Sequence, residues 1–250
     1  MTVDACAELI RRGDPDRFLA VMAAPPAARA WLFPLFAFNL EVARAPWVTQ
    51  EPLIAEMRLQ WWRDVVENAA SGAARAHEVA GPLHDLIRAR SLSVGVLDAL
   101  IAARRWDIHS EPHDGEHGID AYLEDSGAGL MWLAAQAMDA PAEAEAAVRA
   151  YGWAAAAATY LCAIPELEER GRHPLPVGVS PADLARKGLQ RLASARTARA
   201  SVPRGVAPAL LSGWQAEAIL KQVLARQIDP GLSEFSRRSR LLWQAFSGRW

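Results

Sequence analysis

Three histidines recur every four residues in the segment DIHSEPHDGEHG, at His109, His113 and His117. On an unbroken helix, this spacing would place three imidazole rings on one face, and imidazole is a common ligand of zinc and other transition metals. Pro112 and Gly115 interrupt the segment, and both residue types disfavour a helix interior. The segment therefore favours a solvated loop between two helices, with a helical metalloprotein as the open alternative.

Two adjacent tryptophans, Trp61 and Trp62, lie between Arg58 and Arg63 in the string MRLQWWRDVVEN. Indole rings flanked by guanidinium groups can stack on a ligand or hold cation–π contacts. More often such tryptophans belong to a packed core, and the neighbouring arginines pair with acids. The core interpretation is favoured here.

Other catalytic signatures are missing from the sequence, which contains no P-loop, no G-x-G-x-x-G, no H-E-x-x-H and no nucleophile-elbow string. The segment LFPLFAFNLEVARAPWV looks central, yet its only charges are Glu41 and Arg44. The string ELEERGRHPLP, which begins at Glu166, is typical of a charged helix end that runs into a proline-rich loop. These strings define no reaction by themselves.

The elements that must position these residues are predicted to be helices throughout. Asp14 followed by Pro15 predicts a helix start, and Leu59, Trp62 and Val66 form one apolar stripe of another helix. Alternating apolar and polar residues, the mark of a half-buried strand, are absent. The predicted helices cover residues 14–25, 27–45, 51–72, 77–89, 93–107, 119–138, 142–164, 181–200, 207–229 and 231–246. We expect one all-α domain, a helical bundle over residues 1–250.

The composition, with 52% apolar residues, 22% charged residues and a formal net charge of −2, is that of a folded protein. This balance argues against nucleic-acid binding. The two cysteines suit a reducing compartment, the N-terminus has no secretory signal, and no apolar run reaches the about 20 residues of a transmembrane helix. We expect a cytoplasmic protein, and many arginines beside two lysines are typical of a GC-rich bacterial genome.

Four strings, taken in order, resemble the squalene/phytoene synthase family. They are PPAARAWLFPLFAFNLEVA, MRLQWWRDVVENAASG, IDAYLEDSGAGLMWLAA and YLCAIPELEERGRHPLP, and together they span about residues 14–245. The resemblance implies the isoprenoid synthase fold, a helical bundle around a deep apolar cavity. It also places a set of residues at that cavity: Phe36, Asn39, Ala43, Trp47, Arg58, Trp61, Trp62, Tyr122, Tyr160 and Glu166.

The family's synthases ionise a prenyl diphosphate, and magnesium ions held by two aspartate-rich segments stabilise the departing anion. The resemblance assigns the first segment's aspartate positions to Ala43, Arg44 and Trp47. Glu41 lies two residues before Ala43, about 200° around the helix, and so cannot substitute.

The second aspartate-rich segment aligns with residues 163–167, where Ala163 and Leu167 occupy carboxylate positions and Glu166 is retained. The arginines that accompany the two motifs are replaced by Leu40 and Cys162. A single carboxylate cannot hold a magnesium cluster, so we expect no metal and no catalytic residue here.

The resemblance is greatest to a metal-less branch, which includes an assembly factor for respiratory complex I, and Phe38-Asn39-Leu40-Glu41 matches its aFN-x-E string. The first hypothesis is therefore a non-catalytic protein that binds complex I subunits or a lipid. The alternative is an active prenyltransferase, with Mg²⁺ at a displaced site that joins Glu166 to Asp64, Glu124 or Asp125.

The C-terminal segment SEFSRRSRLLWQAFSGRW mixes arginines with large apolar residues. A terminal helix that closes the bundle with a solvated basic edge is favoured. A helix lying on an anionic membrane surface, which would make the protein peripheral at the inner membrane face, is the open alternative.

Overall fold

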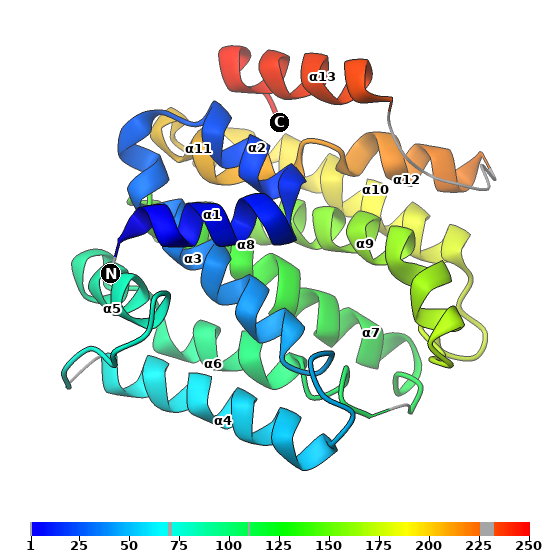
Figure 1. Cartoon of the computed structure of the whole chain (residues 1–250). Helices are drawn as coiled ribbons and strands as arrows, with labels where there is room; N and C mark the ends of the chain where they lie inside the picture. Colours follow the sequence, from blue (N-terminus) through cyan, green and yellow to red (C-terminus); the bar gives the residue numbers. More distant parts are fainter. Residues whose placement is uncertain (1, 70–71, 110, 226–232) are drawn as a thin grey trace.

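The computed structural model describes residues 2–69, 72–109, 111–225 and 233–250, and in these residues it contains helices and no strand (Figure 1). The α-helices are α1 (Val3–Gly13), α2 (Pro15–Ala23), α3 (Pro26–Arg44), α4 (Pro52–Ala69), α5 (Ala80–Arg90), α6 (Val94–Ala103), α7 (Gly115–Leu123), α8 (Gly129–Gln136), α9 (Glu145–Glu169), α10 (Pro181–Thr197), α11 (Ala207–Leu210), α12 (Ala216–Leu224) and α13 (Glu234–Ser247). A π-helical segment, η1 (Glu124–Ala128), joins α7 to α8, and four short 3₁₀ segments are η2 (Ala142–Ala144), η3 (Arg199–Ser201), η4 (Arg204–Val206) and η5 (Leu211–Gly213). The all-α prediction is confirmed.

Local sequence signals explain where several helices begin. The Asp14 side chain accepts a hydrogen bond from the main-chain N–H of Arg17 at 2.9 Å, and Pro15 occupies the first turn of α2. Ser180 and Asp183 cap each other's main-chain N–H groups at the start of α10. These caps satisfy donors that have no partner inside their helices.

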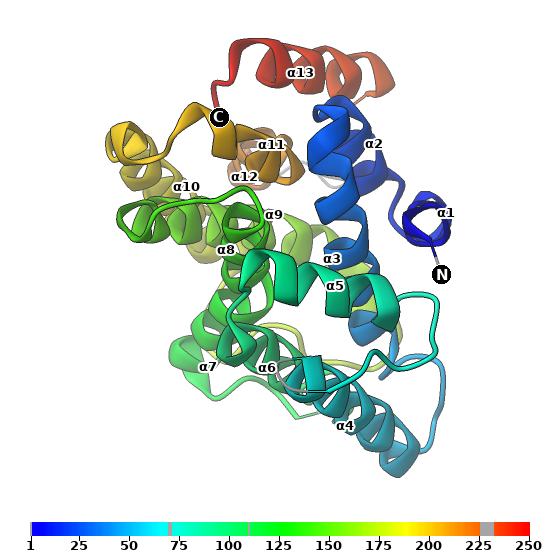
Figure 2. The same cartoon turned by 90° about the vertical axis from the view of Figure 1, so that its left-hand side faces the viewer.

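The core is one continuous cluster of buried apolar side chains centred on α3, α8 and α9. In α3, Pro34 lies inside the helix and every residue from Leu32 to Leu40 is buried. In α4, the predicted stripe of Leu59, Trp62 and Val66 faces the core, which confirms the amphipathic assignment. Helices α10 and α12 pack together along α9. Figures 1 and 2 show α4 and α13 at opposite ends of the molecule.

The structure corrects several predicted elements. Residues 3–13 form α1, for which no helix was predicted. The helix predicted over residues 119–138 is interrupted by η1, and the one predicted over residues 207–229 is broken into α11, η5 and α12. Residues 70–71, 226–229 and 231–232 of the predicted helices lie outside the described residues. Helix α9 holds the long apolar run of residues 151–164, which suggests burial on all sides, but Thr159 and Cys162 are exposed.

No helix among the described residues is both long and apolar enough to cross a membrane.

Candidate functional site

A cavity of about 540 Å³ lies between α3, the end of α6, η1 and α9. Its walls come from segments far apart in the sequence, which the two views in Figures 1 and 2 place around the middle of the bundle. The lining residues are Gly13, Arg17, Asn39, Ala43, Arg44, Trp47, Arg104, Asp107, Tyr122, Leu123, Ser126, Gly127, Leu130, Met131, Gly152, Ala155, Ala156, Thr159, Tyr160, Ala163, Glu166, Leu167, Arg170 and Ser212.

One wall of the cavity consists of closely packed backbone. A Cβ atom built on Gly127 of η1 would lie 2.1 Å from the Cβ of Ala156 in α9, and one on Gly152 would lie 2.9 Å from the Cα of Ala128. These glycines let the two segments approach more closely than side chains would allow. Together with Leu130 they give the cavity an apolar surface.

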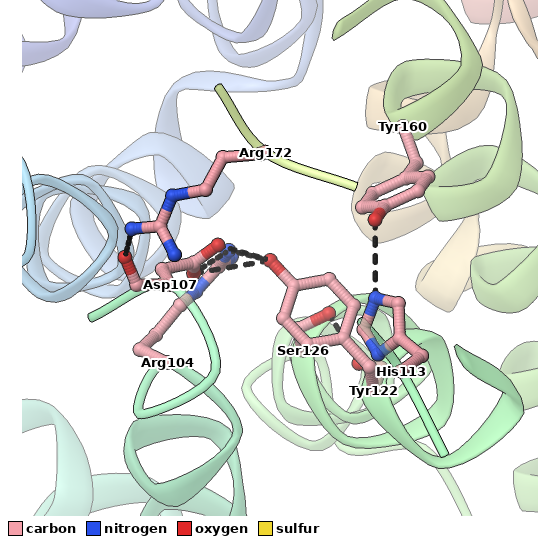
Figure 3. A network of polar contacts seen from close by, with 7 residues as sticks. All are labelled: Arg104, Asp107, His113, Tyr122, Ser126, Tyr160 and Arg172. Atoms are coloured by element: carbon pink, nitrogen blue, oxygen red, sulfur yellow. Dashed lines mark hydrogen bonds and ion pairs between the residues drawn. The ribbon is translucent and has the colours of Figure 1, made fainter. Parts of the chain in front are cut away.

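A buried polar network borders the cavity at the end of α6 (Figure 3). The Arg104 guanidinium donates to the Tyr122 hydroxyl at 2.7 Å and pairs with the Asp107 carboxylate at 3.3 Å. The Tyr122 hydroxyl also lies 3.1–3.2 Å from both Asp107 oxygens, and Arg172 donates to the main-chain carbonyl of Asp107. The Ser126 hydroxyl donates to the Tyr122 carbonyl at 2.5 Å. The network ties the end of α6 to α7, η1 and the segment after α9.

Burial and charge act in opposite directions on this network. Burial raises the pKa of Asp107, whereas the Arg104 guanidinium and the Tyr122 hydroxyl act to lower it. Burial also raises the pKa of Tyr122 well above its usual range. The Tyr122 phenol is therefore neutral and serves as a hydrogen-bond donor.

His113 forms a second buried polar group. Its ring stacks on the Trp106 indole, with ring centroids 3.9 Å apart and an interplanar angle of 7°. Its Nε2 atom lies 3.1 Å from the Tyr160 hydroxyl, which donates to the Pro174 carbonyl at 2.7 Å (Figure 3 shows the His113–Tyr160 contact). Because the only hydroxyl proton goes to Pro174, Nε2 carries the proton of a neutral imidazole and donates to Tyr160.

We expect the free energy of unfolding to fall by about 1–2 kcal/mol between about pH 6.5 and pH 4.5 because of His113. Burial lowers the pKa of His113 from 6.5 to about 4, so in this interval the unfolded chain binds a proton that the folded chain does not. The stability is fully present above pH 6.5 and is lost as the pH falls. Urea unfolding at a series of pH values measures the slope.

His113→Gln is expected to flatten this slope, since glutamine keeps a donor for Tyr160 but does not titrate. The matched control is His109→Gln, because His109 is exposed and should leave the slope as it is in the wild type. An unchanged slope in His113→Gln would show that another group is responsible.

The cavity entrance carries most of its charge on arginines. The Arg170 and Arg172 guanidinium groups lie 4.9 and 5.3 Å from the Trp47 ring centroid, and Glu166 pairs with Arg170 at 2.5 Å. Arg44 is exposed and has no ion pair among the described residues. The retained carboxylate of Glu166 is thus neutralised by its own helix neighbour.

The cavity is basic rather than acidic. Four arginines line it, Arg17, Arg44, Arg104 and Arg170, against two carboxylates, and Arg17 pairs with Asp14 at 2.8 Å outside the lining. Both carboxylates are paired, Asp107 with Arg104 and Glu166 with Arg170. The buried Oδ1 of Asn39 has no hydrogen-bond partner among the residues that the structure describes. A ligand with an apolar part and an anionic head fits this combination better than a divalent cation does.

The structure brings six of the ten residues assigned to the cavity by the resemblance onto its wall, namely Asn39, Ala43, Trp47, Tyr122, Tyr160 and Glu166. The other four are not among the residues that line it. Phe36 is buried beneath the Arg17 guanidinium at 5.2 Å, and Arg58 is exposed on α4. Trp62 is a core side chain against Phe38, with ring centroids 5.4 Å apart. Trp61 packs against Trp62 at 4.8 Å.

The positions assigned to the two aspartate-rich segments also face this cavity, since Ala43, Arg44, Trp47, Ala163, Glu166 and Leu167 all line it. The acids proposed to join Glu166 in a displaced metal site do not line the cavity. Asp64 of α4 accepts from Gln60 at 2.9 Å, and Glu124 pairs with Arg149 at 3.4 Å. Neither these residues nor Asp125 is among the lining residues. No three His, Cys, Asp or Glu side chains in the described part of the chain are arranged to hold a metal ion.

The histidine segment is neither a metal site nor a uniformly solvated loop. His109 and His117 are exposed, whereas His113 is buried. His113 lies in a loop as expected, but it is not solvated, because it packs inward on Trp106. The expected loop is too long at its end, since His117 lies in α7. Of the two arginines that flank the tryptophans, Arg63 behaves as predicted and pairs with Asp98 at 2.5 Å. Arg58 is exposed and forms no ion pair with any described residue.

Residues Arg17, Arg104 and Asp107 line the cavity although no motif singled them out, whereas Arg170 belongs to the string ELEERGRHPLP. For Arg104 and Asp107 a signal was present, since two opposite charges three residues apart follow an apolar helix. Such a pair must find partners where the helix end is buried.

The family model described as squalene/phytoene synthase matches residues 10–210 of the chain. A Bos taurus protein named "NADH dehydrogenase (ubiquinone) complex I, assembly factor 6" is 26% identical over 260 residues, covering 95% of this chain and 78% of that protein. The Homo sapiens protein of the same name is 25% identical over 247 residues, covering 90% and 74%.

Two solved structures share the fold. A dehydrosqualene synthase in complex with a ligand superposes with a TM-score of 0.82 at 12% identity, covering 98% of this chain and 95% of that one. A squalene synthase from Alicyclobacillus acidocaldarius gives a TM-score of 0.76 at 17% identity, covering 92% and 95%. At these identities the likeness establishes the isoprenoid synthase type of helical fold.

Proposed function

The chain belongs to the squalene/phytoene synthase family, and from that premise we propose that it is an assembly factor for respiratory complex I and not a prenyltransferase. The observation that carries the proposal is the 26% identity to a protein named as such a factor along 95% of this chain. The same proposal places the protein in the cytoplasm, at the inner face of the membrane, with complex I subunits as its partners.

The chemistry of the cavity supports a role without prenyl-diphosphate ionisation. That reaction needs several carboxylates around magnesium to stabilise the departing anion. The carboxylates among the lining residues are Asp107 and Glu166, and each is paired with an arginine. The residues present therefore do not fit a magnesium cluster.

The cavity itself is retained, and we propose that it holds a lipid. Small residues of η1 and α9 form an apolar wall, and arginines gather at the entrance. The exposed Arg44 has no ion pair among the described residues, so an anionic head group would give it one. The cavity could bind a lipid without catalysing any reaction of it.

Deleting the gene is expected to remove most assembled complex I and to leave squalene, hopanoid and carotenoid contents unchanged. Assembled complex is measured by native gel activity and by NADH oxidation in membranes. The purified protein is expected to convert neither farnesyl nor geranylgeranyl diphosphate, with Mg²⁺ or with Mn²⁺. A labelled C30 or C40 product, or terpenoid loss with intact complex I, would contradict the proposal and favour the prenyltransferase alternative.

Complementation of the deletion strain tests whether the assembly of complex I depends on the cavity or on another part of the surface. Wild type and Arg88→Glu are expected to restore complex I, because Arg88 is exposed on α5, away from the cavity. Arg44→Glu introduces a negative charge at the entrance and is expected to restore at most about a tenth of it. If Arg44→Glu and Arg88→Glu restore the same amount of complex I, the cavity has no part in the proposed function.

A further inference from the structure

Helix α13 has its polar side toward the bundle. Gln244 is buried and donates to the Leu210 carbonyl at 3.1 Å and to the Tyr151 hydroxyl at 3.4 Å. Arg237 forms an ion pair with Asp16 of α2. The one apolar side chain that α13 buries is Leu241. A helix that merely closes a bundle normally faces the other way, with its apolar stripe inward.

The opposite side of α13 is apolar and exposed. Phe235, Leu242 and Phe246 are 82%, 67% and 92% exposed, and Trp243 beside them is 64% exposed. Their spacing of seven and four residues puts the first three within about 40° of one another around the helix axis. We call these four residues the outer face of α13. Figures 1 and 2 show α13 as the outermost described helix at its end of the molecule.

A cleft of about 340 Å³ adjoins the outer face, and Trp243 lines it as well. Four arginines line this arginine cleft, Arg196, Arg199, Arg240 and Arg249, with Glu217 as the acid among the lining residues. Glu217 is already engaged, by Arg196 at 2.7 Å and by Lys221 at 2.6 Å.

Three arginines of the cleft, Arg199, Arg240 and Arg249, form no ion pair with any described residue. The buried Nε of Arg199 has no hydrogen-bond partner in the described part of the chain. Burial and the neighbouring charges of Arg196 and Arg249 lower the pKa of Arg199. An anion in the cleft would relieve this repulsion and accept the unused N–H groups.

We propose that the outer face of α13 and the arginine cleft together bind the surface of an anionic phospholipid bilayer. The apolar side chains would enter the region between head groups and acyl chains, as in other interfacial helices. The cleft would receive lipid phosphates beside Trp243, a residue type enriched at this depth. A second copy of this chain is a poorer occupant, because a symmetric contact would bring the two arginine clefts together.

Vesicle flotation of the full chain tests the proposal. The protein is expected to float with vesicles of phosphatidylcholine and phosphatidylglycerol and not with vesicles of phosphatidylcholine alone. Phe235→Ser with Phe246→Ser is expected to weaken binding at least about tenfold, because two exposed phenyl rings no longer enter the bilayer. Arg240→Gln and Arg249→Gln are each expected to weaken it about fivefold.

The matched control is Leu53→Ser with Met57→Ser, since these residues of α4 are 73% and 63% exposed at the other end of the molecule. It should bind as the wild type does, and all variants should keep the wild-type melting temperature. Equal loss in the control, or flotation indifferent to phosphatidylglycerol, would overturn the proposal. The proposal would also be overturned if the wild type forms a dimer in light scattering, does not bind vesicles, and becomes a monomer when Phe235 and Phe246 are replaced. This inference does not rest on the proposed role in complex I assembly. Flotation tests membrane binding and complementation tests assembly, so either proposal can fail while the other holds.

Discussion

Replacing Gly127 with valine is expected to destabilise the fold by at least about 4 kcal/mol, enough to unfold many domains of this size. A Cβ atom at this position would lie 2.1 Å from the Cβ of Ala156 and 3.3 Å from its Cα. Neither backbone can shift freely, because η1 and α9 lie in the same packed core. Circular dichroism and urea unfolding measure the loss.

The control for this substitution is Gly95→Ala. A Cβ there would lie 3.9 Å from the nearest atom, the Oγ of Ser93, so alanine fits and should stabilise α6 by about 0.5–1 kcal/mol. Moving the methyl group across the contact, with Gly127→Ala and Ala156→Gly together, should recover most of the stability that Gly127→Ala alone loses. Wild-type stability in Gly127→Val would disprove the close packing of η1 on α9.

Helix prediction succeeded for α4 and missed α1, although both helices repeat apolar residues on one face. In α4, charges fall off the stripe of Leu59, Trp62 and Val66, so the period is visible in the sequence. In α1, the fully buried residues are Cys6 and Ile10, and half-buried residues surround them. Helix α1 packs against α3, and its residues Val3, Cys6 and Ile10 fall at helical spacing, so the sequence holds the apolar period of this helix and the prediction passed over it.

The π-helical segment illustrates a different limit. An extra residue in the turn at Glu124–Ala128 changes which side chains face α9, but a pattern read at 3.6 residues per turn spans it without a break. The small residues around Gly127 signal a close approach in general terms. The partner surface, at Gly152 and Ala156, becomes known only in three dimensions.

Some residues of the candidate site could be predicted from the sequence and others could not. Motif order placed Asn39, Ala43 and Tyr122 on a common wall, which the cavity geometry supports. Trp61 and Trp62 were also expected at the cavity but do not line it. Their rings pack against Phe38 and His77 instead. His113 was misassigned because Pro112 and Gly115 indicate a loop but do not indicate whether a loop side chain turns inward.

Asp107→Ala is expected to lower the free energy of unfolding by about 3–5 kcal/mol. The substitution leaves the Arg104 guanidinium, which is 16% exposed, without the carboxylate that it faces at 3.3 Å. The Tyr122 hydroxyl also loses an acceptor, since both Asp107 oxygens lie within 3.2 Å of it. Urea unfolding at neutral pH gives the difference directly.

Comparison with Tyr122→Phe shows whether the unpaired charge of Arg104 or the lost hydrogen bonds cause the destabilisation in Asp107→Ala. It removes hydrogen bonds from the same network without leaving a charge unpaired, so its cost should be about 1–2 kcal/mol. Arg104→Met combined with Asp107→Leu removes both charges and should be more stable than Asp107→Ala alone. If Asp107→Ala costs no more than Tyr122→Phe, water in the cavity solvates Arg104, and the network orients the cavity wall without supporting the fold.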